Sequence, residues 1–366
     1  METTNAFLPA FGKRPKHIIG RRSITDSFAE GLTLPIGHRQ RATLLIGQRG
    51  TGKTALLLEF AAIATKKDFV VARVTASSEM LDEIIQVIQK NGAEFIPSSK
   101  TKVRGVSAGA LGFSFGLTFN NVTEEQFGFR VKLEMLSDEL AKHGKAILIL
   151  VDEVQANTPE MRILATTYQH LIGENKDIVI AMAGLPSSMS AVLNDDILTF
   201  LNRAYKVYLE PLPYGEISMT YENEFTRQGK SIDPRTLDQL VLATRGYPYL
   251  FQLIGYYTLA YADSTDVITP LIAEKVIISS KHDLVDSIFT AALKPLSEGD
   301  MRFIKAMAQD EESSRIKDVK DRLKVSQSYA QKYRTRLIEA GIIAPVKRGE
   351  IALVIPFLGE YLRGEF

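Results

Sequence analysis

The chain has 366 residues, enough for two or three domains, and 45% of them are hydrophobic, which permits substantial cores. A formal net charge of +1 excludes a uniformly basic nucleic-acid coat protein, so any nucleic-acid surface must be a local concentration of Lys and Arg. The absence of cysteine excludes a disulfide framework, a thiolate zinc site and a cysteine nucleophile. No apolar run is long enough to span a membrane and the N-terminal sequence does not resemble a signal peptide, so we expect a cytoplasmic protein without a membrane partner.

The first predicted segment is residues 1–17, which contain Lys13, Arg14 and Lys16. We predict a flexible basic arm here. A helix ending near Leu32 is expected to follow.

The most specific motif runs from Gly47 to Thr54, reads GQRGTGKT and matches the phosphate-loop pattern G-x-x-x-x-G-K-[ST]. It joins an apolar run suited to a buried strand, 42–46, to a helix-forming run, 54–65. In this motif the glycines let backbone N–H groups face phosphate oxygens, the Lys53 ammonium reaches the β and γ phosphates, and the Thr54 hydroxyl ligates magnesium. The predicted nucleotide-binding residues are Gly47, Gln48, Arg49, Gly50, Thr51, Gly52, Lys53, Thr54 and Ala55. The alternative is a glycine-rich turn before a helix.

Residues 69–74 are predicted to form a second strand, and residues 78–91 an amphipathic helix. The Gly- and Ser-rich segment 97–120 has alternating Phe and Leu residues, which favours an edge hairpin over a partner-binding hairpin. A helical pattern returns over 124–143.

A second nucleotide motif, AILILVDE, occupies residues 146–153. An apolar strand that ends in two acids is the expected companion of a phosphate loop. Asp152 is predicted to hold magnesium, and Glu153 to orient or deprotonate the attacking water. The alternative is a buried strand that ends in solvated carboxylates.

The remaining pattern divides the chain into domains. A helix from Thr158 to about Leu171 and a strand over 177–183 complete an α/β domain, residues 18–212, with a parallel sheet and helices on both faces. Strands are absent from the pattern of 213–294, which we predict to be a helical lid. Three predicted helices and a β-hairpin over 295–366 indicate a winged helix-turn-helix domain.

With these motifs the chain resembles AAA+ P-loop ATPases, especially the origin-recognition and replication-initiator ATPases, and also the STAND-type ATPases. The resemblance runs from IIGRR through GQRGTGKT, LILVDE and LNRAYKVYLEPL to RGYPYLFQL and the C-terminal helices. It implies that Ile19, Gly20, Arg21 and Pro248 contribute to the nucleotide site. It also implies that Arg203 reaches the γ phosphate of a neighbouring subunit, as part of the catalytic set with Lys53 and Glu153; a surface ion pair is the alternative for Arg203. The implied ligands are ATP or ADP with Mg²⁺, and the implied assembly is a homo-oligomer formed on ATP binding.

The sequence departs from this family pattern at two places. The strand after the acidic pair is followed by LPSS, so that only Ser187 and Ser188 stand near the usual polar sensor. In the lid, Tyr249 stands where an Arg often follows the glycine, although Arg245 is close in sequence. We therefore expect an ATPase with slow hydrolysis, suited to a nucleotide-held switch.

Three functions remain open at this point, one of them a motor that remodels protein substrates. Residues 315–348 contain ten Lys and Arg and three acidic residues, an excess of seven positive charges, which favours an ATP-controlled protein that binds double-stranded DNA. In the predicted helix 327–340, Ala330, Tyr333, Leu337 and Ile338 follow core spacing, which turns outward Gln327, Ser328, Gln331, Lys332 and Thr335. The predicted DNA-binding residues are Gln327, Gln331, Lys332, Arg336, Lys347 and Arg348. The alternative is a STAND-type signalling switch whose winged helix binds a protein partner.

Overall fold

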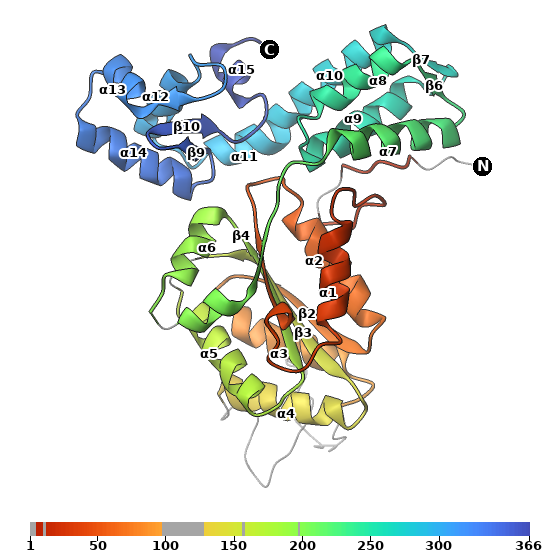
Figure 1. Cartoon of the computed structure of the whole chain (residues 1–366), viewed down its shortest axis with the longest axis vertical. Coiled ribbons are helices and arrows are strands. Elements are labelled where there is room, and N and C mark those ends of the chain that lie inside the picture. Colours follow the sequence, from red (N-terminus) through yellow and green to blue (C-terminus); the bar gives the residue numbers. More distant parts are fainter. Residues whose placement is uncertain (1–4, 10–11, 97–127, 156–157, 197) are drawn as a thin grey trace, which may run out of the picture.

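The computed structural model describes residues 5–9, 12–96, 128–155, 158–196 and 198–366. The segment 97–120, for which we predicted an edge hairpin, lies outside the described residues. Figure 1 shows the α/β domain on one side, with the lid and the C-terminal region next to each other across the end of its sheet. Within the described ranges, no helix is long and apolar enough to cross a membrane.

The α/β domain is built on a five-stranded parallel sheet in the order β2-β3-β4-β1-β5. Its strands are β1 (Ala42–Ile46), β2 (Phe69–Thr75), β3 (Ala146–Val154), β4 (Ile178–Gly184) and β5 (Tyr205–Tyr208). Every residue of β1 and β4 is buried, as expected of central strands covered on both faces. Because all five strands run the same way, the loops after β1, β3 and β4 meet at one edge of the sheet.

Helices cover the two faces of the sheet. Along β1, Leu44 and Ile46 belong to one core and Leu45 to the other, because successive side chains of a strand point to opposite faces. Leu45 packs with α1 (Arg22–Gly31) and α2 (Lys53–Thr65). The opposite face packs with α3 (Met80–Asn91), α4 (Phe129–Ala141), α5 (Pro159–Gly173) and α6 (Pro186–Leu193). Two 3₁₀ turns, Arg39–Arg41 and Thr199–Arg203, precede β1 and β5.

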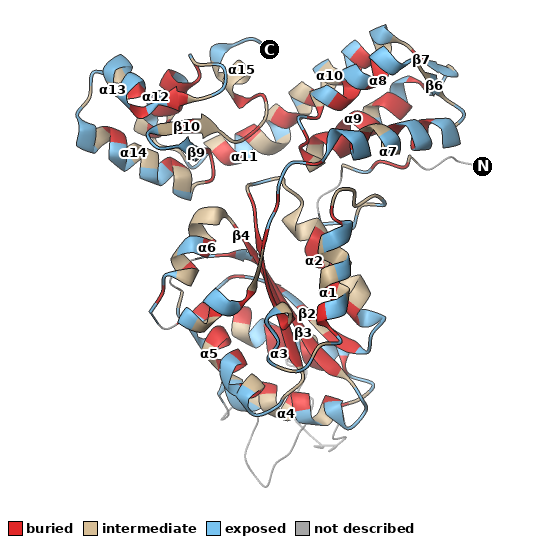
Figure 2. Cartoon of the chain, viewed as in Figure 1, coloured by how far each residue is buried: buried red, intermediate tan, exposed pale blue. Residues whose placement is uncertain are grey.

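The lid contains α7 (Tyr214–Arg227), α8 (Pro234–Ala243), α9 (Pro248–Tyr261) and α10 (Pro270–Leu284). The sequence pattern indicated only helices here, but β6 (Ser231–Ile232) and β7 (Val267–Ile268) pair in parallel between them. Each of these strands has two residues, too few to produce a recognisable alternation. Figure 2 shows the buried residues concentrated in the central sheet and on the inner faces of the lid helices.

The C-terminal region continues directly from the lid. A π-helical turn, Val285–Phe289, and α11 (Thr290–Leu293) extend α10, and one hydrophobic cluster runs from the lid into the C-terminal helices. The region contains α12 (Glu298–Met307), α13 (Ile316–Leu323), α14 (Gln327–Glu339) and α15 (Leu358–Arg363). Its strands β8 (Ser314–Arg315), β9 (Ile343–Lys347) and β10 (Glu350–Leu353) form an antiparallel sheet in the order β8-β10-β9. The three helices and the hairpin lie where the sequence predicted them, whereas β8 and α15 were not predicted.

The N-terminal segment differs from the flexible arm that we expected. Phe7 is completely buried in the lid core, where its ring makes edge-to-face contacts with Tyr221 and Phe251. A Cβ added at Gly255 would lie 2.5 Å from this ring, so α9 has a glycine where the ring enters. On either side of Phe7, Asn5 donates a hydrogen bond to the Tyr256 carbonyl and the Leu8 N–H donates one to Gln252. The described residues 5–9 are therefore part of the lid's packing.

Candidate active site

The phosphate loop connects β1 to α2 at the edge of the sheet where the strands end. Gly50 and Gly52 have φ angles of +73° and +88°, a left-handed conformation that glycine adopts without strain. The loop therefore presents its N–H groups and the N-terminus of α2 to one side, as an anion site requires. The Lys53 ammonium folds back over the loop and donates hydrogen bonds to the carbonyls of Gly47 (2.9 Å) and Gln48 (2.8 Å).

The pKa of the Lys53 ammonium is lowered. Burial lowers its pKa from 10.5 to about 8, and the nearby Asp152 and Glu153 carboxylates only partly offset this effect. The ammonium is thus held in a place where water stabilises it poorly. A phosphate group is the natural counterion for such a cation.

The two acids at the end of β3 occupy different environments. Asp152 is buried (8% exposed) and accepts a 2.7 Å hydrogen bond from the Thr54 hydroxyl, so the two predicted magnesium ligands lie together. Glu153 is exposed and has a φ angle of +52°, at an irregularity in the pairing of β3 with β4. This rare backbone conformation turns the Glu153 side chain out of the sheet, and the residue lines the cavity beside the phosphate loop.

A cavity of about 570 Å³ extends from the phosphate loop to the lid and the N-terminal segment. Of the predicted nucleotide-binding residues, Arg49 to Ala55, Ile19, Arg21 and Pro248 line it. The Arg21 guanidinium itself is buried and donates hydrogen bonds to the carbonyls of Gly20 (3.2 Å) and Glu210 (2.5 Å), and burial lowers its pKa. Gly47, Gln48 and Gly20 are not among the lining residues: Gly20 turns the chain with φ +64° against Pro213.

Tyr247 contacts the phosphate loop from the lid, a contact that the sequence did not predict. Its hydroxyl donates a 2.9 Å hydrogen bond to the Arg49 carbonyl, and a Cβ added at Gly50 would lie 1.8 Å from that hydroxyl. Pro248, next along the chain, approaches Gly52. The triplet Gly246-Tyr247-Pro248 could be recognised in the sequence, but the direction of the tyrosine could not.

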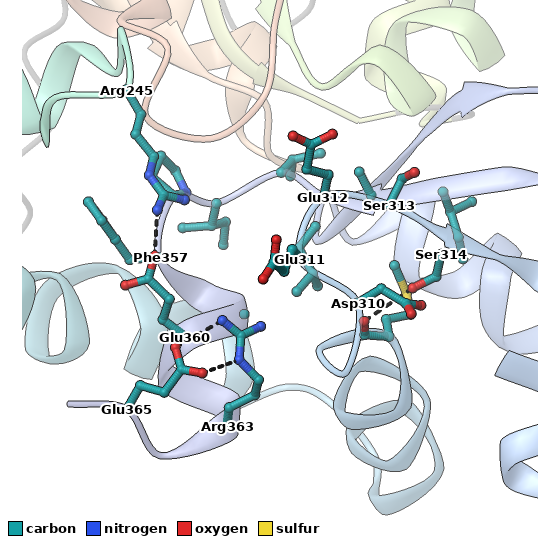
Figure 3. A pocket seen from close by; sticks show the side chains of 18 residues that line it. Arg245, Asp310, Glu311, Glu312, Ser313, Ser314, Phe357, Glu360, Arg363 and Glu365 are labelled. Carbon is teal, nitrogen blue, oxygen red and sulfur yellow. Dashed lines mark hydrogen bonds and ion pairs between the residues drawn. The ribbon is translucent and has the colours of Figure 1, made fainter. Parts of the chain in front are cut away.

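The residues at the two places where the sequence departs from the family pattern have different surroundings. Ser188 lines the cavity, whereas the Ser187 hydroxyl donates a 3.4 Å hydrogen bond to the Glu339 carbonyl at the end of α14. Tyr249 lines the cavity and donates to Ser287. Arg245 faces a second cavity of about 500 Å³, where it pairs with Glu360 and lies over the Phe357 ring (Figure 3). Its guanidinium is thus directed toward α15, and although Arg245 is close in sequence to the usual lid arginine, it does not line the cavity beside the phosphate loop.

Arg203 is exposed in the 3₁₀ turn before β5. The first residues of β5 pair with the start of β1, at Thr43 and Tyr205, and the phosphate loop follows the other end of β1. Arg203 therefore lies near the end of the sheet where the strands begin, whereas the phosphate loop of its own chain lies at the end where they finish. Any role in hydrolysis would have to be exerted on another subunit.

The predicted DNA-binding residues fall into two groups. Gln327, Gln331 and Lys332 are exposed on the N-terminal half of α14, and Ala330 and Leu337 are fully buried, as the helical spacing indicated. Arg348 is also exposed, in the turn between β9 and β10. Arg336 instead pairs at 2.8 Å with the buried Asp300.

Carboxylates outside the counted window reduce the positive charge of the C-terminal region. Arg336 pairs with Asp300, Arg322 with Asp310, and both Arg315 and Lys347 with Glu350. The excess of seven charges counted over 315–348 thus overstates the field of this surface. Of the four predicted DNA-binding cations, Arg336 and Lys347 are paired, whereas Lys332 and Arg348 form no ion pair with the described residues and are the two of this set most available to a ligand.

The C-terminal region also touches the phosphate loop. The Arg49 guanidinium donates a 3.5 Å hydrogen bond to the Ala340 carbonyl, just after α14. A Cβ added at Gly341 would lie 3.2 Å from Leu185 and 3.6 Å from the Gln48 side-chain oxygen. The end of α14 therefore packs on the loops that follow β1 and β4.

Comparison with known proteins identifies the fold. A family model described as a domain of unknown function (DUF8462) matches residues 286–362, and no curated protein matches the chain. The chain is similar to the Walker-type ATPase of Pyrococcus abyssi, with 17% identity and a TM-score of 0.67 over 96% of this chain and 97% of that one. It is also similar to the ORC2 protein of Aeropyrum pernix (14%, 0.63, 97% and 94%) and to Cdc6p of Pyrobaculum aerophilum (16%, 0.51, 97% and 96%). The chain therefore shares the fold of these proteins, which confirms the predicted α/β fold with a parallel sheet and flanking helices.

Proposed function

We propose that this protein binds ATP with Mg²⁺ and hydrolyses it slowly, and that the nucleotide controls the C-terminal region. The observation that carries the proposal is the meeting of Lys53, Thr54, Asp152 and Glu153 in one cavity beside the phosphate loop. The similar ORC2 protein was solved with ADPNP and ADP, which supports a nucleotide as the ligand.

The phosphate loop and the two acids have different chemical tasks in this proposal. The loop N–H groups and Lys53 bind and orient the phosphates, and Lys53 leaves its carbonyl partners to do so. Thr54 and Asp152 fit a magnesium ion, which uses one or two protein oxygens together with phosphate oxygens and water and supplies charge neutralisation when bound. Glu153, turned out by its left-handed backbone, is placed to accept a proton from the attacking water.

Two substitutions test this assignment. Lys53→Ala should weaken ATP binding about tenfold to hundredfold, because charged hydrogen bonds to phosphate are lost. Glu153→Gln should bind ATP like the wild type and turn it over about a hundredfold more slowly, the size of a general-base effect. Titration with a fluorescent ATP analogue and a phosphate-release assay measure the two effects. Wild-type affinity in Lys53→Ala would refute nucleotide binding at this loop.

We further propose that the C-terminal region is a winged helix that binds double-stranded DNA through the N-terminal half of α14. Gln327, Gln331 and Lys332 are exposed there and form a polar face of the type that reads base edges and phosphates. Arg348, in the turn between β9 and β10, is placed to contact the DNA backbone from the hairpin.

The test is the salt dependence of duplex binding. Lys332→Glu and Arg348→Glu should each weaken binding to all duplexes and reduce the slope of log affinity against log salt by about one. Lys275→Glu in α10 makes the same charge change on the lid and is the matched control. An equal effect of all three substitutions, or no binding at low salt with ATP or ADP, would refute DNA binding through α14.

A second function, a signalling switch that binds a protein partner, is favoured by one observation. The end of α14 packs on the phosphate loop through Arg49 and Ala340, so the C-terminal region is positioned to follow the nucleotide state. In this case the exposed face of α14 binds a protein in one nucleotide state only. A nucleotide-dependent change in protease sensitivity of the C-terminal region, without duplex binding, would support the switch.

A further inference from the structure

The turn between α8 and α9 is fixed on several sides. Thr244 is fully buried, and its hydroxyl accepts a 3.1 Å hydrogen bond from the Gly246 N–H. The Gly246 carbonyl accepts a 2.7 Å hydrogen bond from the Leu212 N–H, where the α/β domain joins the lid. Arg245 and Gly246 are both left-handed, with φ angles of +49° and +66°. A side chain at Gly246 would meet the Leu212 carbonyl at 2.9 Å, so the turn allows little movement relative to the joint.

Two side chains of this turn, one on each side of Gly246, contact different parts of the molecule. Arg245 is held by Glu360 and Phe357 of the C-terminal region (Figure 3). Tyr247 points to the phosphate loop, is buried (6% exposed) and donates its hydroxyl to the Arg49 carbonyl. Burial raises the pKa of Tyr247, so the hydroxyl stays protonated and remains a donor.

The contact with Tyr247 falls on the middle of the phosphate loop. The hydroxyl group bonds the Arg49 carbonyl, and the ring occupies the space above Gly50 that any side chain at that position would need. These are backbone contacts, so they set the direction of the peptide groups between Arg49 and Thr51. Those peptide N–H groups are the ones that an anion in this loop would meet.

We propose that Tyr247 is a positioning residue that holds the phosphate loop in its nucleotide-binding conformation from the lid. The proposal rests on the proposed function, because it assumes that the loop binds nucleotide. Tyr247 does not act on the reacting atoms. It restricts the loop before the nucleotide binds, so less conformational entropy is lost on binding.

The test compares Tyr247→Phe with Tyr257→Phe. Tyr247→Phe keeps the ring and removes one neutral hydrogen bond, so the Kd for ATP and ADP should rise about threefold to tenfold. KM should rise by the same factor and kcat should stay within about twofold, because Asp152 and Glu153 do not contact this tyrosine. Tyr257 lies on α9, the helix that begins directly after Tyr247, and bonds Asp283 at 2.7 Å outside the cavity, so Tyr257→Phe should leave Kd unchanged.

The outcomes separate this inference from the function itself. An unchanged Kd in Tyr247→Phe, with binding lost in Lys53→Ala, refutes the positioning role and leaves the nucleotide site intact. Equal losses of affinity in Tyr247→Phe and Tyr257→Phe also refute it, because the effect is then general to the lid. If Lys53→Ala binds like the wild type, the proposed function has failed. All affinities are measured below the unfolding temperature of each variant.

Discussion

Replacement of Lys53 by Met should make the nucleotide-free protein more stable at neutral pH. Burial lowers the Lys53 pKa from 10.5 to about 8, which corresponds to a cost of about 3 kcal/mol for keeping the charged form below pH 8. Met keeps the apolar stem without the charge. The carbonyls of Gly47 and Gln48 then lose their donor, and the loss of these two hydrogen bonds should lower the stability by about 1–2 kcal/mol. The net gain should be about 1–2 kcal/mol, and ATP binding should be lost.

The pH dependence identifies the cause. Between pH 8 and 10.5 the unfolded chain binds more protons at Lys53 than the folded chain, so wild-type stability rises with pH. Met has no such proton, so the wild type should gain about 2 kcal/mol relative to Lys53→Met from pH 7 to pH 9.5. Urea unfolding followed by far-UV circular dichroism measures this, since the chain contains no Trp. A stability difference that stays constant over this pH range would refute the argument.

Three further substitutions test other contacts. Phe7→Ala should lower the free energy of unfolding by about 3–4 kcal/mol, because it empties a site in the lid core, whereas Leu8→Ala, at a half-exposed position (46%), should change it by less than about 1 kcal/mol in urea unfolding. Arg336→Ala leaves the buried Asp300 carboxylate without its cation and should cost about 2–3 kcal/mol; Arg336→Lys should recover part of the loss in the same assay, and no recovery would argue against the ion pair. Arg203→Ala should abolish any rise of ATP turnover per chain with protein concentration and leave ATP affinity unchanged; a rise that persists would assign Arg203 a local role.

The sequence allowed the phosphate loop, the acidic pair and most of the strands to be placed, because each rests on local patterns. β1 was predicted with its observed bounds, and the helix predicted from Thr158 to about Leu171 is observed as α5, which the Thr158 hydroxyl caps. β5 was not predicted as a strand, since its four residues, YKVY, lie at the edge of the sheet and only Val207 is buried. An edge strand of this kind lacks the continuous apolar run that marks the central strands.

The parts of the site that the sequence did not indicate depend on contacts between distant residues. Tyr247 is separated from Arg49 by 198 positions, and no local pattern shows that a lid tyrosine bonds the loop. The charge count over 315–348 likewise omitted Asp300 and Asp310, which lie on or after α12 and neutralise arginines of the following helices. The three basic residues Lys13, Arg14 and Lys16 favoured the prediction of a flexible arm, whereas the buried Phe7 determines where residues 5–9 lie.

The burial of Phe7 also constrains the order in which the chain assembles during synthesis. Asn5 and its partner Tyr256 are 251 positions apart, so the ribosome releases the N-terminal segment long before it makes the helices that receive Phe7. The last strand of the α/β domain, β5, ends at Tyr208. All five strands have therefore been synthesised before the lid helices, and the α/β domain can fold first. Phe7 can pack only after α7 and α9 have emerged from the ribosome. Because its contacts join residues far apart in the sequence, closure of the lid core is a late step of folding.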